Sequence, residues 1–272
     1  MRTIRLLSVL TISVFSAACL QSAALITINA DGSGTVEQRS SMTAAALAQI
    51  RLFAGSFGQP GGKPIDPFSE QEARKLAGQM GDGVTFVSST PITTAAAEGR
   101  INVYRFPDIT KLRFNGMPNA PGNTNVRVPD TPLLGNRSTG ITFEFVRTPE
   151  GHSLVTLHMP GQAVDELLKP EGTARSQTIQ PEQLAMMRQM FAGMKISIQV
   201  QPTGRLVRTN SSYVDGQVVT LFDLDLDELL KDDGVVSRLQ AAKTKEELTA
   251  LMASIPGLKA QLGDVTIEFT GK

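Results

Sequence analysis

The sequence contains few of the residues that many functional sites require. Its 272 residues include one cysteine, two tyrosines and no tryptophan. A single thiol forms no internal disulfide, so the fold has to rest on its hydrophobic core. The shortage of large aromatic side chains argues against a stacking platform for sugars or nucleic-acid bases.

An excess of positive charge is also missing. The chain has 26 basic and 26 acidic residues, and no stretch concentrates lysine and arginine. Proteins that bind nucleic acids normally need concentrated positive charge to neutralise phosphates. We therefore expect no nucleic-acid partner.

Histidine is scarce as well, with His152 and His158 as the two examples in the chain. Nucleophilic catalysis by serine or cysteine needs a nearby base, and two histidines are too few to complete a metal site without partners at a recognisable spacing. We expect one turn histidine and one histidine at a strand end. The sequence predicts no catalytic residue, metal or cofactor, and the protein is not expected to be an enzyme. A paired-carboxylate enzyme remains an alternative, because spatial pairing of acids is invisible in a sequence.

An acidic run, Asp223-Leu224-Asp225-Leu226-Asp227-Glu228, is the strongest candidate for a cation site. A helix-loop-helix calcium loop needs glycine at its sixth position and glutamate at its twelfth, and this run has Glu228 and Gly234 there. The motif therefore fails. We expect Leu224 and Leu226 to face inward and Asp227 to cap a helix.

The first residues have the pattern of an export signal. Arg2 and Arg5 precede an apolar run over residues 6–15, and the small residues at 16–18 lead directly to Cys19. Ser16-Ala17-Ala18-Cys19 resembles the bacterial lipobox. The pattern predicts a lipoprotein signal peptide over residues 1–18, with Cys19 carrying diacylglycerol on its thiol and a fatty acid such as palmitate on its amino group.

Two other readings of this region stay open. Ordinary secretory cleavage could follow Ala24, because Ser22-Ala23-Ala24 supplies small residues at both required positions. Alternatively, residues 6–28 could remain as an uncleaved anchor, because 23 residues are enough to span a bilayer. Only the lipoprotein reading keeps Cys19 at the start of the mature chain.

The remaining chain shows clustered strand and helix patterns rather than a strict alternation. Residues 25–29 and 34–40 predict a β-hairpin, and Ser69 and Thr244 have the capping pattern of helix starts. Such clustering predicts an α+β fold, mainly an antiparallel β-sheet with several packed amphipathic helices.

We divide the chain into five parts. After the signal, residues 19–24 are expected to form a tether and residues 25–113 the N-terminal part of an α+β domain. Residues 114–140 are rich in proline, glycine and asparagine and are expected to form a long loop. Residues 141–272 are then the C-terminal part of the same domain or a second α+β domain.

A methionine-rich segment follows Pro181. One stripe at helical spacing is widened by two further methionines, so the apolar ligand candidates are Met186, Met187, Met190, Phe191 and Met194. Methionine surfaces adapt to irregular apolar ligands such as acyl chains, or to a protein partner. The ordinary alternative is a core helix that packs against the sheet.

Two patches carry a family resemblance. Residues 26–36, Ile-Thr-Ile-Asn-Ala-Asp-Gly-Ser-Gly-Thr-Val, resemble the opening strand pair of LppM-like bacterial lipoproteins. Thr209-Asn210 and the segment 215–220 resemble the later hairpin of that family. The resemblance implies a lipoprotein exposed in the cell envelope, and a lipid-binding role has been associated with the fold.

These observations predict an exported, membrane-tethered lipoprotein of non-enzymatic type that binds membrane lipid through Cys19 and a further lipid or other apolar ligand. We expect it in the cell envelope, facing the periplasm or the exterior, with a secreted or soluble periplasmic protein as the alternative. A second functional hypothesis is a protein-interaction module in an envelope assembly, with residues 115–140 as the docking segment.

Overall fold

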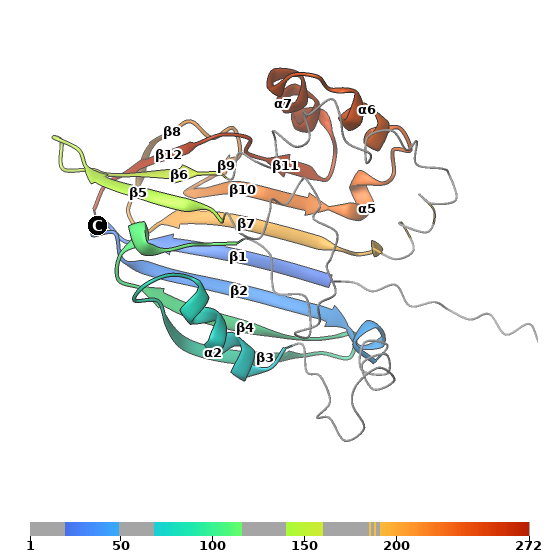
Figure 1. Cartoon of the computed structure of the whole chain (residues 1–272), viewed down its shortest axis with the longest axis horizontal. Helices are drawn as coiled ribbons and strands as arrows, with labels where there is room; N and C mark the ends of the chain where they lie inside the picture. Colours follow the sequence, from blue (N-terminus) through green and yellow to red (C-terminus); the bar gives the residue numbers. More distant parts are fainter. Residues whose placement is uncertain are drawn as a thin grey trace, which may run out of the picture.

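The protein is mostly β-structure, as Figure 1 shows. The computed structural model describes residues 20–48, 68–115, 140–159, 185, 188 and 191–271. Of the described residues, 46% lie in strands and 22% in helices. The fold is α+β only in a broad sense, and the expectation of several packed amphipathic helices is wrong, because two sheets build most of the core.

Eight strands form the larger sheet. They are β1 (Leu20–Ile28), β2 (Gly34–Thr43), β3 (Thr85–Thr93), β4 (Ala97–Phe106), β7 (Lys195–Pro202), β9 (Val214–Asp215), β10 (Val218–Asp225) and β11 (Leu258–Ala260). Their order is β11-β10-β7-β1-β2-β4-β3, and β9 pairs with β10. Within this sheet β1 and β7 are parallel and the other described pairs are antiparallel. Strand β1 is thus a central strand with a partner on each side.

Four strands form the smaller sheet. They are β5 (Thr142–Arg147), β6 (Ser153–His158), β8 (Leu206–Thr209) and β12 (Val265–Phe269). They pair antiparallel in the order β5-β6-β12-β8. The smaller sheet therefore joins segments from the middle and the end of the chain.

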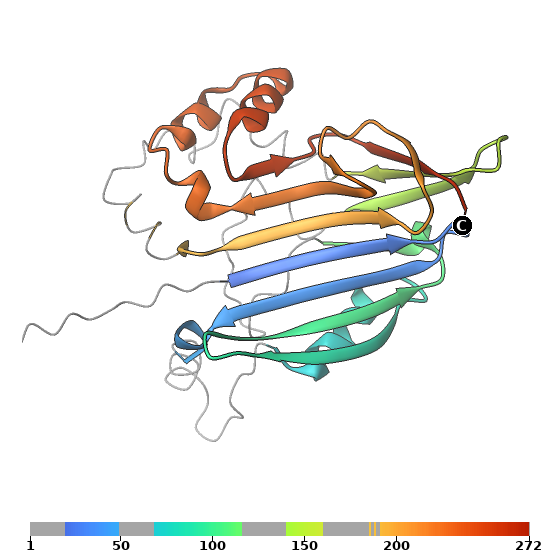
Figure 2. The same cartoon turned by 180° about the vertical axis from the view of Figure 1, so that it is seen from behind.

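The helices are short. They are α2 (Glu70–Gln79), the 3-10 turn η1 (Ile109–Lys111), α5 (Leu226–Leu229), α6 (Val235–Ala241) and α7 (Lys245–Ser254), and residues 44–48 are also helical. Both predicted caps are confirmed, because Ser69 accepts from the Glu72 amide and Thr244 from the Glu247 amide. Helix α2 lies over β3 and β4 on one face of the larger sheet (Figure 1), and in the view from behind it lies beyond these two strands (Figure 2).

The predicted hairpin at the start of the chain is confirmed. The Asn29 amide donates to the Ser33 carbonyl at 2.8 Å, and Gly32 takes the left-handed conformation at φ 85°. Strand β1 nevertheless begins at Leu20, so residues 20–24 are not a tether. Alternation continues through this segment, and Ala24 is buried together with Ile26 and Ile28.

One hydrophobic cluster contains buried side chains of both sheets. Ile26 and Tyr104 belong to it from the first part of the chain, and Phe143, Leu157 and Ile267 from the second. The Ser153 hydroxyl also donates to the Ala30 carbonyl at 2.7 Å, which ties the smaller sheet to the β1–β2 turn. The parts at 25–113 and 141–272 therefore share a core.

The expected loop at 114–140 lies mostly outside the described residues. Its two ends meet, because Phe114 and Ile141 form an isolated antiparallel bridge with N–O distances of 3.1 and 2.8 Å. Among the helices that the structure describes, none has the length and apolar character needed to cross a membrane.

Candidate functional site

Several strand ends meet at one end of the larger sheet. Leu20 at the start of β1 pairs with Met42 near the end of β2, and Gln21 pairs with Lys195 at the start of β7. Lys195 in turn pairs with Asp225, the last residue of β10. We call this set of strand ends the Leu20 end. The described chain finishes near the opposite end of the sheet (Figure 1).

The predicted lipidation residue adjoins the Leu20 end in the sequence. Cys19 itself is outside the described residues, but it directly precedes Leu20. Residues 20–24 pair with β2 residues 38–42 on one side, and 21–24 pair with β7 residues 195–198 on the other. No residue separates Cys19 from a strand held on both sides.

An ion pair joins two strands at the Leu20 end. Lys195 Nζ lies 2.5 Å from Asp225 Oδ2. This hydrogen bond raises the pKa of Lys195 and lowers the pKa of Asp225, because each group is better stabilised in its charged form.

The acidic run continues into α5. Asp225 is the helix cap and accepts from the Glu228 amide at 3.3 Å, so the expectation that Asp227 would cap the helix is wrong. Asp227 instead accepts from the Gly193 amide at 2.9 and 3.0 Å. Leu224 is buried, as predicted, and Leu226 is partly buried against the core. Among the described side chains, no group of three or more histidines, cysteines or acids could hold a metal ion.

A cavity of about 370 Å³ lies beside α5, and it is lined by Arg188, Asp227, Leu230, Lys231 and Asp233. Arg188 Nε donates to the Leu230 carbonyl at 2.8 Å, and its guanidinium also pairs with Asp233. Lys231 Nζ lies 2.5 Å from Glu228 Oε1. Four of the five lining residues are charged, and each of the two cations is paired with an acid. This lining is unlike the mostly apolar lining of a lipid-binding pocket.

The methionine candidates are placed in part. Met186, Met187 and Met190 fall outside the described residues. Phe191 and Met194 are half-buried, and Met194 packs against the core. The Leu226 amide donates to the Met194 carbonyl at 3.0 Å, so this segment adjoins α5. Whether the five candidates form one apolar surface stays a prediction.

The two histidines occupy the predicted kinds of position. His152 lies in the turn before β6, and His158 is the last residue of β6. His152 Nδ1 is 2.9 Å from Glu268 Oε1, and His158 Nδ1 is 2.9 Å from Asp264 Oδ2. Each histidine is thus paired with a carboxylate from the last part of the chain.

His158 has a second acidic neighbour. Its Nε2 lies 3.3 Å from Glu144 Oε1, in a geometry that is not a hydrogen bond. The hydrogen bond with Asp264, together with the negative charges of Asp264 and Glu144, raises the pKa of His158 despite its partial burial.

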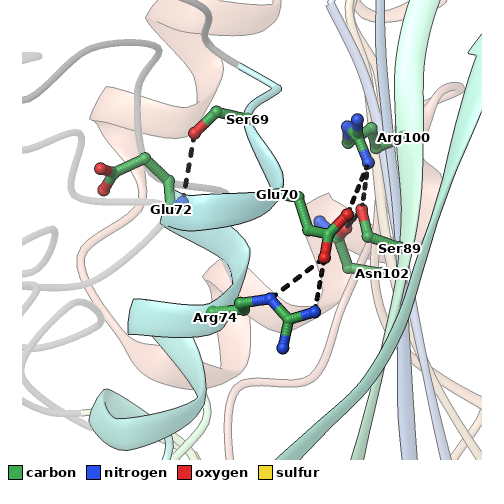
Figure 3. A network of polar contacts seen from close by, with 7 residues as sticks. All are labelled: Ser69, Glu70, Glu72, Arg74, Ser89, Arg100 and Asn102. Atoms are coloured by element: carbon green, nitrogen blue, oxygen red, sulfur yellow. Dashed lines mark hydrogen bonds and ion pairs between the residues drawn. The ribbon is translucent and has the colours of Figure 1, made fainter.

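A network of polar contacts connects α2 to β3 and β4 (Figure 3). Glu70 accepts from Arg74 Nη2 at 2.6 Å and lies 3.9 Å from Arg100 Nη1. Arg100 also donates to Ser89 Oγ at 2.7 Å, and that hydroxyl donates to Asn102 Oδ1 at 2.6 Å. These contacts join a helix to two strands, so we assign this network a role in holding the fold together.

Aromatic contacts extend the same packing. The Arg74 guanidinium lies 4.3 Å from the ring centroid of Phe86, which meets Tyr104 edge-on at 6.2 Å. Burial raises the pKa of Tyr104 to about 12, and its hydroxyl has no hydrogen-bond partner among the described residues.

Comparisons with known proteins add little. No protein-family model matches the chain, and no curated protein sequence matches it. The structure is similar to the NMR structure of the folded domain of Mycobacterium tuberculosis LppM, with a TM-score of 0.32 and 9% sequence identity. The similarity covers 96% of this chain and 95% of that one. This is a weak structural relationship to a lipoprotein domain, and no function is transferred from it.

The sequence analysis did not identify the partners of these polar groups. Lys195 and Asp225 are 30 positions apart, and Arg188 and Asp233 are 45 positions apart, so nothing local links them. The signal that was available is strand alternation, which places Asp223 and Asp225 on the face opposite Leu224.

Proposed function

We propose that the mature protein is a non-enzymatic lipoprotein of the cell envelope, tethered through acylated Cys19, with a domain that starts at Leu20. The observation that carries this proposal is the pairing of residues 20–24 with β2 and of residues 21–24 with β7 at the centre of the larger sheet. The three processing routes differ in how much of β1 they leave paired in the sheet.

Secretory cleavage after Ala24 would remove five of the nine residues of β1. The neighbouring segments of β2 and β7 would lose their common partner, and their backbone groups would have to find water instead. An uncleaved anchor over 6–28 would place the whole of β1 in a helix across the bilayer, which excludes its sheet pairing. Cleavage before Cys19 leaves every β1 pair intact, and this difference favours the lipoprotein route.

The finer ligand proposal concerns the methionine surface. Phe191 and Met194 adjoin α5, and the charged cavity next to them does not suit an acyl chain. We therefore propose Met186, Met187 and Met190, which lie outside the described residues, as the contacts of an apolar ligand in place of this cavity. Native mass spectrometry of the purified domain tests this point, with a lipid adduct that disappears in Met187→Glu as the expected result. A clean mass of the polypeptide alone contradicts ligand binding.

The tether is tested by the mass of the mature N-terminus. The full chain is expressed in a bacterium with lipoprotein processing, extracted from membranes with detergent and measured intact. The expected mass is that of residues 19–272 plus diacylglycerol and one further fatty acid, and Cys19→Ser should carry no acyl mass. An unmodified chain that begins at Leu25 would show that secretory cleavage is the true route.

A comparison of two directly expressed chains tests the structural premise. One begins at Leu20 and the other at Leu25. Each ladder hydrogen bond contributes about 1 kcal/mol net, so the shorter chain is expected to lose at least about 3 kcal/mol of unfolding free energy. If the two chains were equally stable in urea unfolding, the pairing of residues 20–24 would not favour the lipoprotein route.

A further inference from the structure

The Leu20 end is a candidate interaction surface. Its partner would be the lipid surface, because the proposed tether at Cys19 directly precedes Leu20. This inference rests on the proposed acylation of Cys19. A trans peptide link places consecutive Cα atoms about 3.8 Å apart, so acyl chains on Cys19 would begin within one residue of the sheet. We infer that the Leu20 end faces the lipid surface directly and that the strands of the larger sheet point away from it.

Rigid pairing keeps the first residues of β1 from swinging. Leu20 is paired with Met42, and Gln21 is paired with both Ser41 and Lys195. A flexible linker would let a domain take many orientations, but a central strand cannot turn without breaking its ladders. The direction of β1 is therefore fixed within the domain, and the short link to Cys19 would hold the Leu20 end near the lipid.

The length of the sheet separates its two ends. Strand β1 has nine residues, which correspond to about 30 Å at about 3.3 Å per residue. The turn at Ala95 connects β3 to β4 beside the Thr43–Ala97 pair, at the Leu20 end. Glu150 lies in the β5–β6 turn, three residues before Ser153, whose hydroxyl donates to the Ala30 carbonyl at the other end of β1. Both ends are visible in Figures 1 and 2.

The basic side chains described beside the Leu20 end are paired with acids. Three basic side chains there, Lys195, Lys231 and Arg188, are each paired with an acid at ion-pair distance. Anionic membranes attract clusters of unpaired lysine and arginine, whereas paired charges gain little. We therefore base the orientation on the covalent tether and not on attraction between these three side chains and lipid headgroups.

The test uses the full lipidated protein in vesicles. Acylation consumes the thiol of Cys19, so one introduced cysteine becomes the sole free thiol and can carry a fluorophore. Ala95→Cys and Glu150→Cys are matched variants, because both positions are exposed and lie in turns between strands. The vesicles are phosphatidylcholine containing a fraction of phosphatidylcholine with a nitroxide on its headgroup, which quenches over short distances.

We expect quenching at position 95 to exceed quenching at position 150 by at least about threefold, because the two turns lie at ends of the sheet about 30 Å apart. Replacing part of the lipid with phosphatidylglycerol should leave that ratio unchanged. Equal quenching, stronger quenching at position 150, or a ratio that arises only with phosphatidylglycerol would overturn the orientation. The intact mass distinguishes a wrong orientation from a missing tether. A chain without acyl mass contradicts the proposed function and, with it, the orientation.

Discussion

His152 Nδ1 lies 2.9 Å from Glu268 Oε1, and Arg208 Nη2 lies 2.9 Å from the other oxygen of the same carboxylate. The three residues come from the turn before β6, from β12 and from β8. Glu268 is 7% exposed, so its charge depends on these two partners for stabilisation. The hydrogen bond from His152, followed by the charge of Arg208, lowers the pKa of Glu268.

Glu268→Gln is expected to destabilise the protein at neutral pH and to reduce its sensitivity to acid. A carboxyl whose pKa is lowered on folding stabilises the native state above its unfolded pKa, and this contribution is lost as pH falls through the folded pKa. Unfolding free energies from urea titrations at about pH 7 and about pH 3 would measure the change.

The exposed Glu150→Gln in the β5–β6 turn is the matched control and should leave both values close to wild type. If Glu268→Gln keeps the full acid sensitivity of the wild type, the cluster does not contribute to folding stability in this way.

The stability contributed by His158 is expected to fall as pH rises, whereas the stability contributed by Glu268 falls as pH decreases. Its pKa is raised above the ordinary value of 6.5, first by the hydrogen bond with Asp264. The extra stability is therefore complete below that ordinary value and is lost as pH rises through the folded pKa. Since the side chain is 33% exposed, solvent screening limits the effect to less than about 1 kcal/mol.

A His158→Gln variant separates this contribution. The stability difference between wild type and variant should be larger at about pH 5.5 than at about pH 8.5. Thermal unfolding at both pH values measures this difference, and Asp264→Asn serves as a second variant because it removes the negative charge that His158 faces. A difference that grows toward alkaline pH would show that the pair is not charged as described.

Local patterns in the sequence predicted local structure well. The β1–β2 hairpin follows from alternation around Ala30-Asp31-Gly32, and Ser69 and Thr244 cap helices where their spacing to Glu72 and Glu247 indicates. Hydrogen bonds within four residues are encoded by neighbours in the chain, so these features need no knowledge of the rest of the fold.

Long-range pairing was the part that the sequence did not show. The parallel partner of β1 is β7, which begins at Lys195, and Glu268 meets His152 across 116 positions. The apolar helical stripes suggested packed helices, whereas strands contribute most of the buried core. The sequence predicts a tether over residues 19–24 because apolar and polar residues alternate clearly only from Leu25, whereas β1 begins at Leu20.

The Thr244 cap offers a test of local stabilisation. Thr244 Oγ1 accepts from the Glu247 amide at 3.1 Å, and the Glu247 carboxylate accepts from the Lys243 amide at 2.8 Å. Thr244→Ala should cost about 1 kcal/mol of unfolding free energy, because a helix-end amide loses its partner. Thr249→Ala in the same helix removes the same atoms away from the cap, and chemical denaturation should place it within about 0.5 kcal/mol of wild type. Equal losses in the two variants would contradict a capping role.

Gly34 and Gly78 form a matched pair for the last prediction. A Cβ on Gly34 would lie 2.0 Å from the Thr27 carbonyl oxygen and 2.5 Å from Phe106 Cζ, so backbone and core would have to move. Gly78→Ala meets no atom within 4 Å and replaces an exposed glycine inside α2. Gly34→Ala should lower the unfolding free energy by about 1–3 kcal/mol. The alanine at position 78 should raise it by about 0.5–1 kcal/mol, since glycine is the poorer helix former. Thermal unfolding of the two variants gives the sign directly: a stabilising Gly34→Ala would mean that β1 and β2 are not packed in the register that brings Thr27 and Phe106 against Gly34.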